Sequence, residues 1–202
     1  MIAALWRALV IGTLIAGAVG AVRQRREATA TRRGELPPAS ASAEVEPRVS
    51  YGPLARRLSA WVPAPPRTPF GRVVSSVWAG PLTVVGLGLA ILSGRSPAWD
   101  PDLHCLVVRG AGGPSKVALR SVGAHANTVG QIVIATQAQP SAVLLAHEAV
   151  HARQAERFGP LLFPLYVWLG ARYGYRDNPL ERAARAGARQ WMDQRPGAGS
   201  AS

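Results

Sequence analysis

The strongest helix signal of this 202-residue chain lies in residues 139–160, which read QPSAVLLAHEAVHARQAERFGP. Residues 142–157 hold good helix formers throughout and contain neither glycine nor proline, which predicts a continuous helix. Ser141 is a candidate N-cap, because a serine hydroxyl can accept a hydrogen bond from the first turn. Gly159 and Pro160 follow and are expected to end the helix.

The predicted helix carries an H-E-x-x-H motif, formed by His147, Glu148 and His151. Residues four apart lie one turn apart on the same face, so both imidazoles can reach one zinc ion. Glu148 stands beside the first histidine and can act as general base for a water molecule that zinc activates. The chain has four histidines and one cysteine, so chance pairing at this spacing is improbable and a multi-cysteine metal site is excluded.

A catalytic zinc ion usually takes a third protein ligand and keeps one position open. Glu181 is the first choice, because it lies thirty residues after His151, one turn into the next well-formed helix. A helical hairpin would bring it back beside the motif. Asp177, His125 and Glu156 are the competitors, although Glu156 lies about 140° round the helix from His151.

The motif and the later glutamate resemble the gluzincin metallopeptidases, in which a glutamate on a later helix completes the zinc site. A longer match is similar to a group of small, uncharacterised, membrane-associated bacterial proteins, over about residues 73–187. The matching residues are 147–154 (HEAVHARQ), 157–160 (RFGP), 175–179 (YRDNP), and Glu181, Arg182 and Ala184. The resemblance implies that His147, His151 and Glu181 are zinc ligands and that Glu148 is the base.

One position departs from the gluzincin pattern. Gluzincins often carry an aspartate four residues after the ligand glutamate, where it orients a ligand histidine, and this chain has Arg185 there. Other polar residues near the motif are candidates for stabilising an oxyanion or positioning a ligand. They are Tyr175, Tyr173, His125 and Asn178.

Short apolar runs before the motif predict a small sheet. Leu103–Arg109 and Val117–Val122 are rich in β-branched residues and flank a glycine-rich turn, which predicts a hairpin. A third strand is expected over Thr128–Thr136. With predicted helices over 161–172 and 180–194, the expected fold is α+β, a short antiparallel sheet packed on a three-helix zincin-like core over residues 99–195.

Two apolar runs precede this domain and predict one or two N-terminal transmembrane helices. Residues 8–22 carry no charge but are short for a span, so segment 1–22 is either a retained anchor, which the arginines after it favour, or a cleaved signal peptide. Residues 73–93 match a transmembrane helix in length and flanking charge. The alternative for the second run is a buried hairpin or a core helix of a soluble domain.

Residues 23–72 are rich in arginine and proline, which predicts a largely disordered linker with a short helix near Leu54–Trp61. Residues 196–202 are expected to form a disordered tail. The linker holds ten arginines against four glutamates, a net charge of +6. If both apolar runs span, the positive-inside rule places the linker in the cytoplasm and the motif domain outside.

The net charge of the whole chain is +12, which raises nucleic acid and an anionic membrane surface as partners. The basic residues are scattered and no nucleic-acid-binding motif accompanies them, which argues against nucleic acid. The sequence therefore predicts a metallopeptidase-like protein of the cell membrane that uses Zn²⁺ to hydrolyse a peptide or protein substrate, with membrane lipid as partner. The alternative is a catalytically silent, zinc-stabilised interaction module on the membrane.

Overall fold

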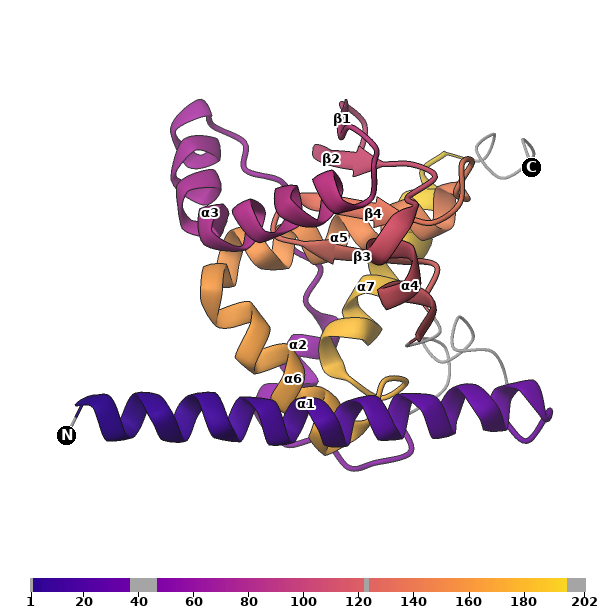
Figure 1. Ribbon diagram of the computed structural model, residues 1–202. Helices are drawn as coiled ribbons and strands as arrows, with labels where there is room; N and C mark the ends of the chain where they lie inside the picture. The colour runs from indigo at the N-terminus through magenta and orange to yellow at the C-terminus, as the bar shows by residue number, and fades with distance from the viewer. Residues whose placement is uncertain (1, 37–46, 122–123, 196–202) are drawn as a thin grey trace. The chain divides into compact units, whose positions relative to one another are not determined.

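The computed structural model describes residues 2–36, 47–121 and 124–195, and it has the predicted α+β class (Figure 1). The chain forms two compact units. One comprises the residues up to Ala60 together with Phe163–Ala183, and the other comprises Trp61–Leu162 together with the residues from Ala184 onward. The boundary between the units falls inside the last helix, which is one continuous element.

The second unit contains a mixed sheet of four strands in the order β1-β2-β4-β3. The strands are β1 (Ala98–Asp100), β2 (Cys105–Val108), β3 (Ala126–Val129) and β4 (Ile132–Ala135). The β1–β2 and β3–β4 pairs are antiparallel, but β2 and β4 run parallel. The prediction of a purely antiparallel sheet is therefore wrong, because a crossover that contains a helix joins β2 to the β3–β4 pair.

That helix, α4 (Gly113–Ser121), replaces the second strand of the predicted hairpin. Ser115 and Leu119 are buried one turn apart, whereas Val117 between them is exposed. The Ser115 hydroxyl donates a hydrogen bond to the carbonyl oxygen of Leu89 at 2.8 Å. Burial at a spacing of four residues is helical, which explains why this β-branched run does not form a strand. Val122, the last residue of the predicted strand, lies outside the described residues.

The single strand predicted over 128–136 is instead the hairpin β3–β4, which turns at Gly130 and Gln131. Gly130 has a φ of +64°, and a Cβ at this position would overlap the backbone of Thr83. Only glycine fits both the conformation and the close approach. A glycine inside an otherwise strand-like run is the sequence signal for this turn.

The helices around the motif match the predictions. α5 (Ala142–Phe158) begins after Ser141, whose hydroxyl accepts a hydrogen bond from the Leu144 N–H at 3.3 Å. It ends at Gly159, which has a φ of +56°. A 3-10 helix η2 (Gly159–Leu161), α6 (Leu162–Tyr173) and α7 (Pro179–Asp193) follow.

Both faces of the sheet are covered within the second unit. One face packs against α5 and against Trp191 of α7, through Leu103, Cys105, Val107, Val133, Leu145, Ala149 and Ala152. The other face packs against α3 (Pro69–Leu92) and α4, through Ala90, Val108, Ala111, Leu119, Ile132 and Ile134. Burial on both sides explains why β4 is apolar at every position.

In the first unit, α1 (Ile2–Arg32) continues ten residues into the segment predicted as a disordered linker. Residues 23–32, the first part of the predicted linker, are therefore helical. Neither glycine nor proline interrupts this stretch, and Gly34, with a φ of +74°, follows the helix end. α2 (Pro53–Ala60) agrees with the short helix expected there. The rest of the predicted linker over 37–46 and the predicted tail lie outside the described residues.

Within the described part of the chain, α3 is the one helix long and apolar enough to cross a membrane, a test that a core helix of a soluble protein also passes. Its buried residues are small ones, Ser75, Ala79, Gly86 and Ala90. Only 22% of its most apolar window is buried. Most of its large apolar side chains are therefore left exposed by the fold.

Candidate metal centre

His147 and His151 project from the same face of α5, and their rings meet edge to face with centroids 4.9 Å apart. The two Nε2 atoms lie 3.2 Å apart. Two imidazole nitrogens on a tetrahedral zinc ion, each about 2.0–2.1 Å from the metal, would be about 3.3 Å apart. The pair is therefore spaced as two ligands of one ion.

A buried glutamine fixes the orientation of His151. Nδ1 of His151 donates a hydrogen bond to Oε1 of Gln154 at 2.8 Å. Gln154 is fully buried and lies three residues later on the same helix. Protonation of Nδ1 leaves Nε2 with a lone pair for a metal, which is how proteins commonly set the tautomer of a ligand histidine.

Glu181 lies in the first turn of α7 and is 2% exposed. One ligand atom from each of His147, His151 and Glu181 lies within 4.8 Å of those of the other two. Two imidazole nitrogens and one carboxylate oxygen form a known ligand set of catalytic metal ions. This group could therefore hold a metal ion.

A glycine and a tyrosine contribute contacts to α7, the helix that carries Glu181. α7 approaches α5 closely at Gly187, where an added Cβ would lie 2.7 Å from Cγ2 of Val150. Within the first unit, the hydroxyl of Tyr166 on α6 donates to Oε1 of Glu181 at 2.6 Å. That hydrogen bond restricts the rotation of the buried carboxylate.

Glu148 is held by the neighbouring strand. The Thr128 hydroxyl on β3 lies 2.7 Å from Oε2 of Glu148 and 3.0 Å from its carbonyl oxygen, and it can donate to either. Glu148 is 5% exposed. A buried carboxylate with a fixed hydroxyl partner is positioned to accept a proton in a defined direction.

Two of the competing ligands are engaged elsewhere. Glu156 accepts a hydrogen bond from Nε2 of Gln131 at 2.7 Å, which agrees with the prediction that it points away from the motif. Asp177 forms an ion pair with Arg48 at 3.4 Å. The carbonyl oxygen of Asp177 also accepts a hydrogen bond from the Tyr51 hydroxyl. These contacts favour Glu181 as the third ligand.

The other polar residues proposed for the site form a helix cap, a ring contact and a backbone hydrogen bond. Asn178 accepts a hydrogen bond from the Leu180 N–H at 3.0 Å and so caps α7. Tyr173 packs edge-on against another tyrosine ring. The carbonyl oxygen of His125 accepts a hydrogen bond from the Thr136 N–H. Their role in stabilising an oxyanion, like that of Tyr175 in the α6–α7 loop, stays a prediction.

The single cysteine lies in the hydrophobic core, outside the group of residues that could hold a metal ion. Cys105 is fully buried, and burial raises the pKa of its thiol to about 12. Close by, Arg153 donates from Nη2 to the carbonyl oxygen of Leu103 at 3.1 Å, and burial lowers the pKa of its guanidinium group. A thiol that stays protonated is a poor nucleophile at neutral pH.

Sequence reasoning did not assign Gln154, Thr128 or Tyr166 to the site. The sequence could have identified Gln154, because a residue three positions after His151 lies near the same face of the helix. Thr128 and Tyr166 act across elements that are distant in sequence, so no spacing rule identifies them.

No protein-family model matches this chain, and no curated protein or solved structure matches it either. The features of the chain that bear on its function are therefore the group formed by His147, His151 and Glu181 and the buried Glu148.

Proposed function

We propose that this chain is a membrane-associated, zinc-dependent hydrolase of peptides, with a gluzincin-like arrangement of its site. His147, His151 and Glu181 would hold the metal, and Glu148 would be the general base. The observation that carries the proposal is the pair of Nε2 atoms 3.2 Å apart on one face of α5, in a group with Glu181 that could hold a metal ion. Nitrogen and carboxylate donors in this combination suit zinc.

A bound zinc ion would supply a Lewis acid that brings the pKa of water near 7 and polarises the substrate carbonyl. Glu148 accepts the proton of the attacking water and returns it to the amine nitrogen as the carbon–nitrogen bond breaks. The Thr128 hydroxyl holds the Glu148 carboxylate in place during both transfers. Gln154 keeps the proton of His151 on Nδ1, away from the ligand position.

The sheet supports a peptide as the substrate. β3 is the last strand in the sheet order, so its outer edge offers backbone groups to which an extended chain can add. Thr128 belongs to this strand and contacts Glu148 directly. A peptide bound along β3 would therefore run past the proposed base.

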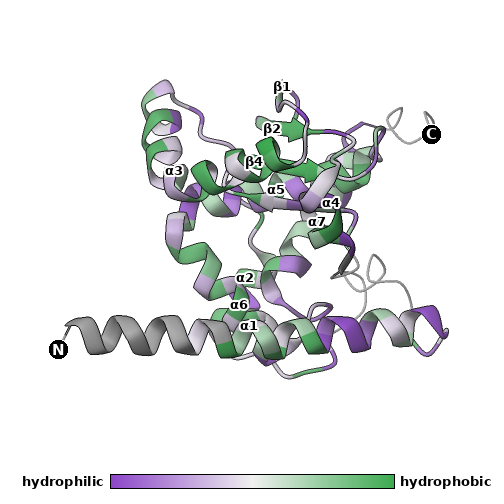
Figure 2. Cartoon of the chain, in the orientation of Figure 1, coloured by the Kyte–Doolittle hydropathy of each residue, from purple (hydrophilic) through white to green (hydrophobic). Residues whose placement is uncertain are grey.

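Membrane association is supported by the surface of α3. Its exposed large apolar residues are Phe70, Val73, Val74, Val77, Trp78, Val84, Val85, Leu87, Ile91 and Leu92. An apolar surface of this extent is unusual on a monomeric soluble protein. Figure 2 shows hydrophobic residues along this helix.

A second candidate is a catalytically silent, zinc-stabilised module, which the burial of the site favours. Glu148 is 5% exposed and Glu181 is 2% exposed, so little of either residue is in contact with solvent. In such a module the metal would contribute to folding rather than to hydrolysis.

Metal analysis of the purified full chain in detergent tests the shared premise. We expect one zinc ion per chain, with loss of the metal in His147→Ala and weakened retention in Glu181→Ala. Asp177→Asn is the matched control and should keep the metal. A chain without bound zinc contradicts both candidates, and loss of zinc only in Asp177→Asn would replace Glu181 by Asp177.

A further inference from the structure

The inner face of α1 is covered by its own unit. An added Cβ at Gly17 would touch Val167 of α6 at 3.7 Å, and one at Gly20 would touch the backbone of Ala171 at 3.6 Å. One turn further, Nη1 of Arg23 donates to the carbonyl oxygen of Arg172 at 2.9 Å. Contacts of α1 with α6 and its C-terminal end therefore continue along one face for about two turns.

The outer face of α1 is exposed and changes from apolar to basic along the helix axis. Ile15, Val19 and Val22 are 61%, 43% and 51% exposed, and they form an apolar stripe. Arg26 continues the same stripe, because these four residues fall within about 60° round the helix axis. Arg33 is exposed and follows directly after the last residue of α1. Only about 6 Å of axial rise separates Val22 from Arg26. Figure 2 shows this change from hydrophobic to hydrophilic residues towards the C-terminal end of α1.

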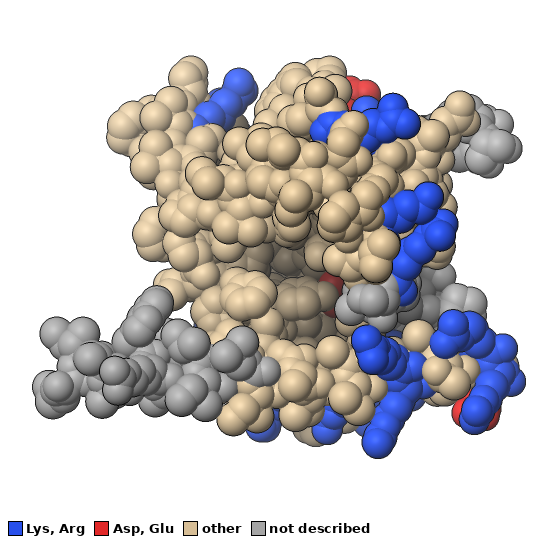
Figure 3. Space-filling model, viewed as in Figure 1, with Lys and Arg blue, Asp and Glu red and all other residues tan. Residues whose placement is uncertain are grey.

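The acidic residues of α1 and its end do not cancel this charge. Glu27 faces inward, where its Oε2 accepts a hydrogen bond from the Arg176 N–H at 3.0 Å. Burial of its side chain is the largest of several effects and raises the pKa of Glu27. Glu35 is exposed and lies 3.9 Å from Arg33, a distance that gives little stabilisation at a surface. Figure 3 shows the arginines gathered at this end of α1.

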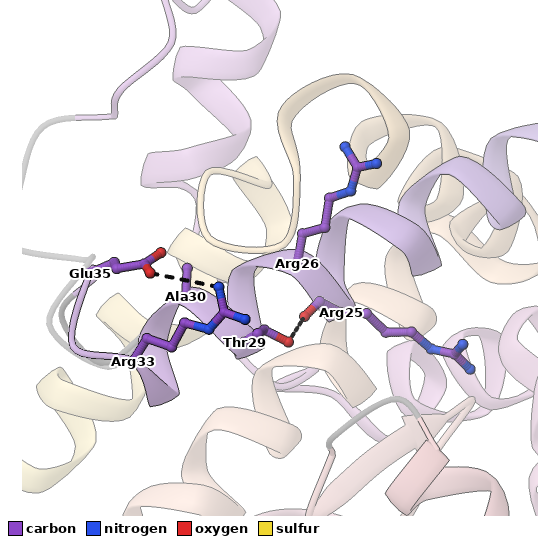
Figure 4. Close-up of a pocket in the computed structure, with 6 residues that line it drawn as sticks. All are labelled: Arg25, Arg26, Thr29, Ala30, Arg33 and Glu35. Atoms are coloured by element: carbon purple, nitrogen blue, oxygen red, sulfur yellow. Dashed lines mark hydrogen bonds and ion pairs between the residues drawn. The ribbon is translucent and has the colours of Figure 1, made fainter.

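The basic residues spread outward instead of converging on one point. A shallow hollow of about 300 Å³ lies between Arg25, Arg26, Thr29, Ala30, Arg33 and Glu35. In Figure 4 the guanidinium groups of Arg25 and Arg26 point away from each other, and Arg33 turns towards Glu35. Diverging cations fit an extended array of anions better than a single small ligand.

We propose that the outer face of α1 from Ile15 onward, together with Arg33 directly after the helix, docks on an anionic lipid surface. The apolar stripe enters the acyl boundary, and Arg25, Arg26 and Arg33 contact phosphate headgroups, as in other helices that pair an apolar stripe with arginines. This proposal rests on the membrane association proposed above and adds the lipid class and the contacting residues. A lipid surface explains the apolar stripe, which a nucleic acid would leave exposed.

The test uses the full chain reconstituted in vesicles with equal parts of phosphatidylcholine and phosphatidylglycerol. The protein is extracted in mild detergent, and the ratio of the two lipids that stay bound is measured. We expect an enrichment of phosphatidylglycerol by about fivefold or more, lost at about 1 M salt where screening acts beyond about 3 Å. The triple variant Arg25→Gln, Arg26→Gln, Arg33→Gln should return to the bulk ratio.

Arg56→Gln, Arg57→Gln, Arg120→Gln removes the same charge from exposed positions outside α1 and should keep the enrichment. Equal lipid ratios in the parent chain, or equal enrichment in both triple variants, overturn the docking proposal alone. A chain that does not float with the vesicles contradicts the membrane association itself. Retention of added RNA that only the α1 variant abolishes, without lipid enrichment, would overturn the proposal in favour of nucleic acid.

Discussion

Nδ1 of His151 donates to the buried Oε1 of Gln154 at 2.8 Å, and this contact determines which nitrogen of His151 faces His147. The histidine pair is thus arranged by a residue of the same helix, one turn further on. A helix that carries H-E-x-x-H and a buried glutamine at this spacing contains two histidines of the candidate metal site and a residue that orients one of them.

Gln154→Ala should weaken zinc binding by about 10–100-fold, because His151 loses the acceptor that fixes its tautomer. Gln154→Glu keeps an acceptor at the same position and should bind zinc at least as well as the parent. Competition with a chelator of known affinity measures both variants. Gln190→Ala, an exposed glutamine on α7, is the control for a change of the same kind. Equal zinc affinity in Gln154→Ala and Gln154→Glu would show that the contact is only structural.

Glu148→Gln should keep zinc and lose hydrolysis by a factor of about 10²–10⁴, because an amide cannot accept the proton of water. Thr128 can still donate to the amide oxygen, so the fold should be preserved. Turnover of a peptide library by the parent and the variant, with zinc measured on the same samples, checks this. Glu156→Gln changes a buried glutamate of the same helix that bonds to Gln131 and should stay active. Similar loss in both variants would remove Glu148 from the mechanism.

Thr128→Val should lower hydrolysis about tenfold without loss of zinc, because the hydroxyl that holds the Glu148 carboxylate is replaced by a methyl group of similar size. Thr128→Ser keeps a hydroxyl and should recover most of the activity. The rate at saturating peptide separates this effect from weaker peptide binding to β3. Full activity of the valine variant would mean that β3 does not position the base.

The helices of the candidate metal centre could be predicted from the sequence because their signals are local. Ser141 and Gly159 mark the two ends of α5, and the H-E-x-x-H spacing needs only helical geometry. The prediction for the α4 segment was wrong, because a β-branched residue such as Val117 favours a strand locally. Burial at positions four apart, which favours a helix, depends on the rest of the fold. The same helix allows β2 and β4 to pair in parallel, so the wrong prediction for this one element also made the predicted sheet topology wrong.

With two membrane spans, the linker and the motif domain are predicted to lie on opposite sides of the membrane. Two hydrogen bonds inside the first unit disagree with this prediction. Arg23 bonds to the carbonyl oxygen of Arg172, and Glu27 accepts from the Arg176 N–H. Residues 23–27 and 172–176 must therefore lie on one side of any membrane. α3 stands between them in sequence, and α6, with twelve residues, is too short to cross back.

We therefore predict that α3 does not cross the membrane as a single span, so that residues on either side of it share one compartment. Two single-cysteine substitutions test this: Glu35→Cys introduces a thiol before α3, and Arg120→Cys introduces one after it. Both positions are exposed. The native Cys105 is buried, and its thiol, with a pKa of about 12, should not react, so it can stay in both variants. A membrane-impermeant maleimide applied to sealed cells should label both introduced cysteines or neither, and both after permeabilisation. The positive-inside rule favours protection of both, because arginines crowd the residues after the apolar run of α1. Labelling of one variant and protection of the other would show that α3 spans the membrane and that the contacts of Arg23 and Glu27 do not form in the cell.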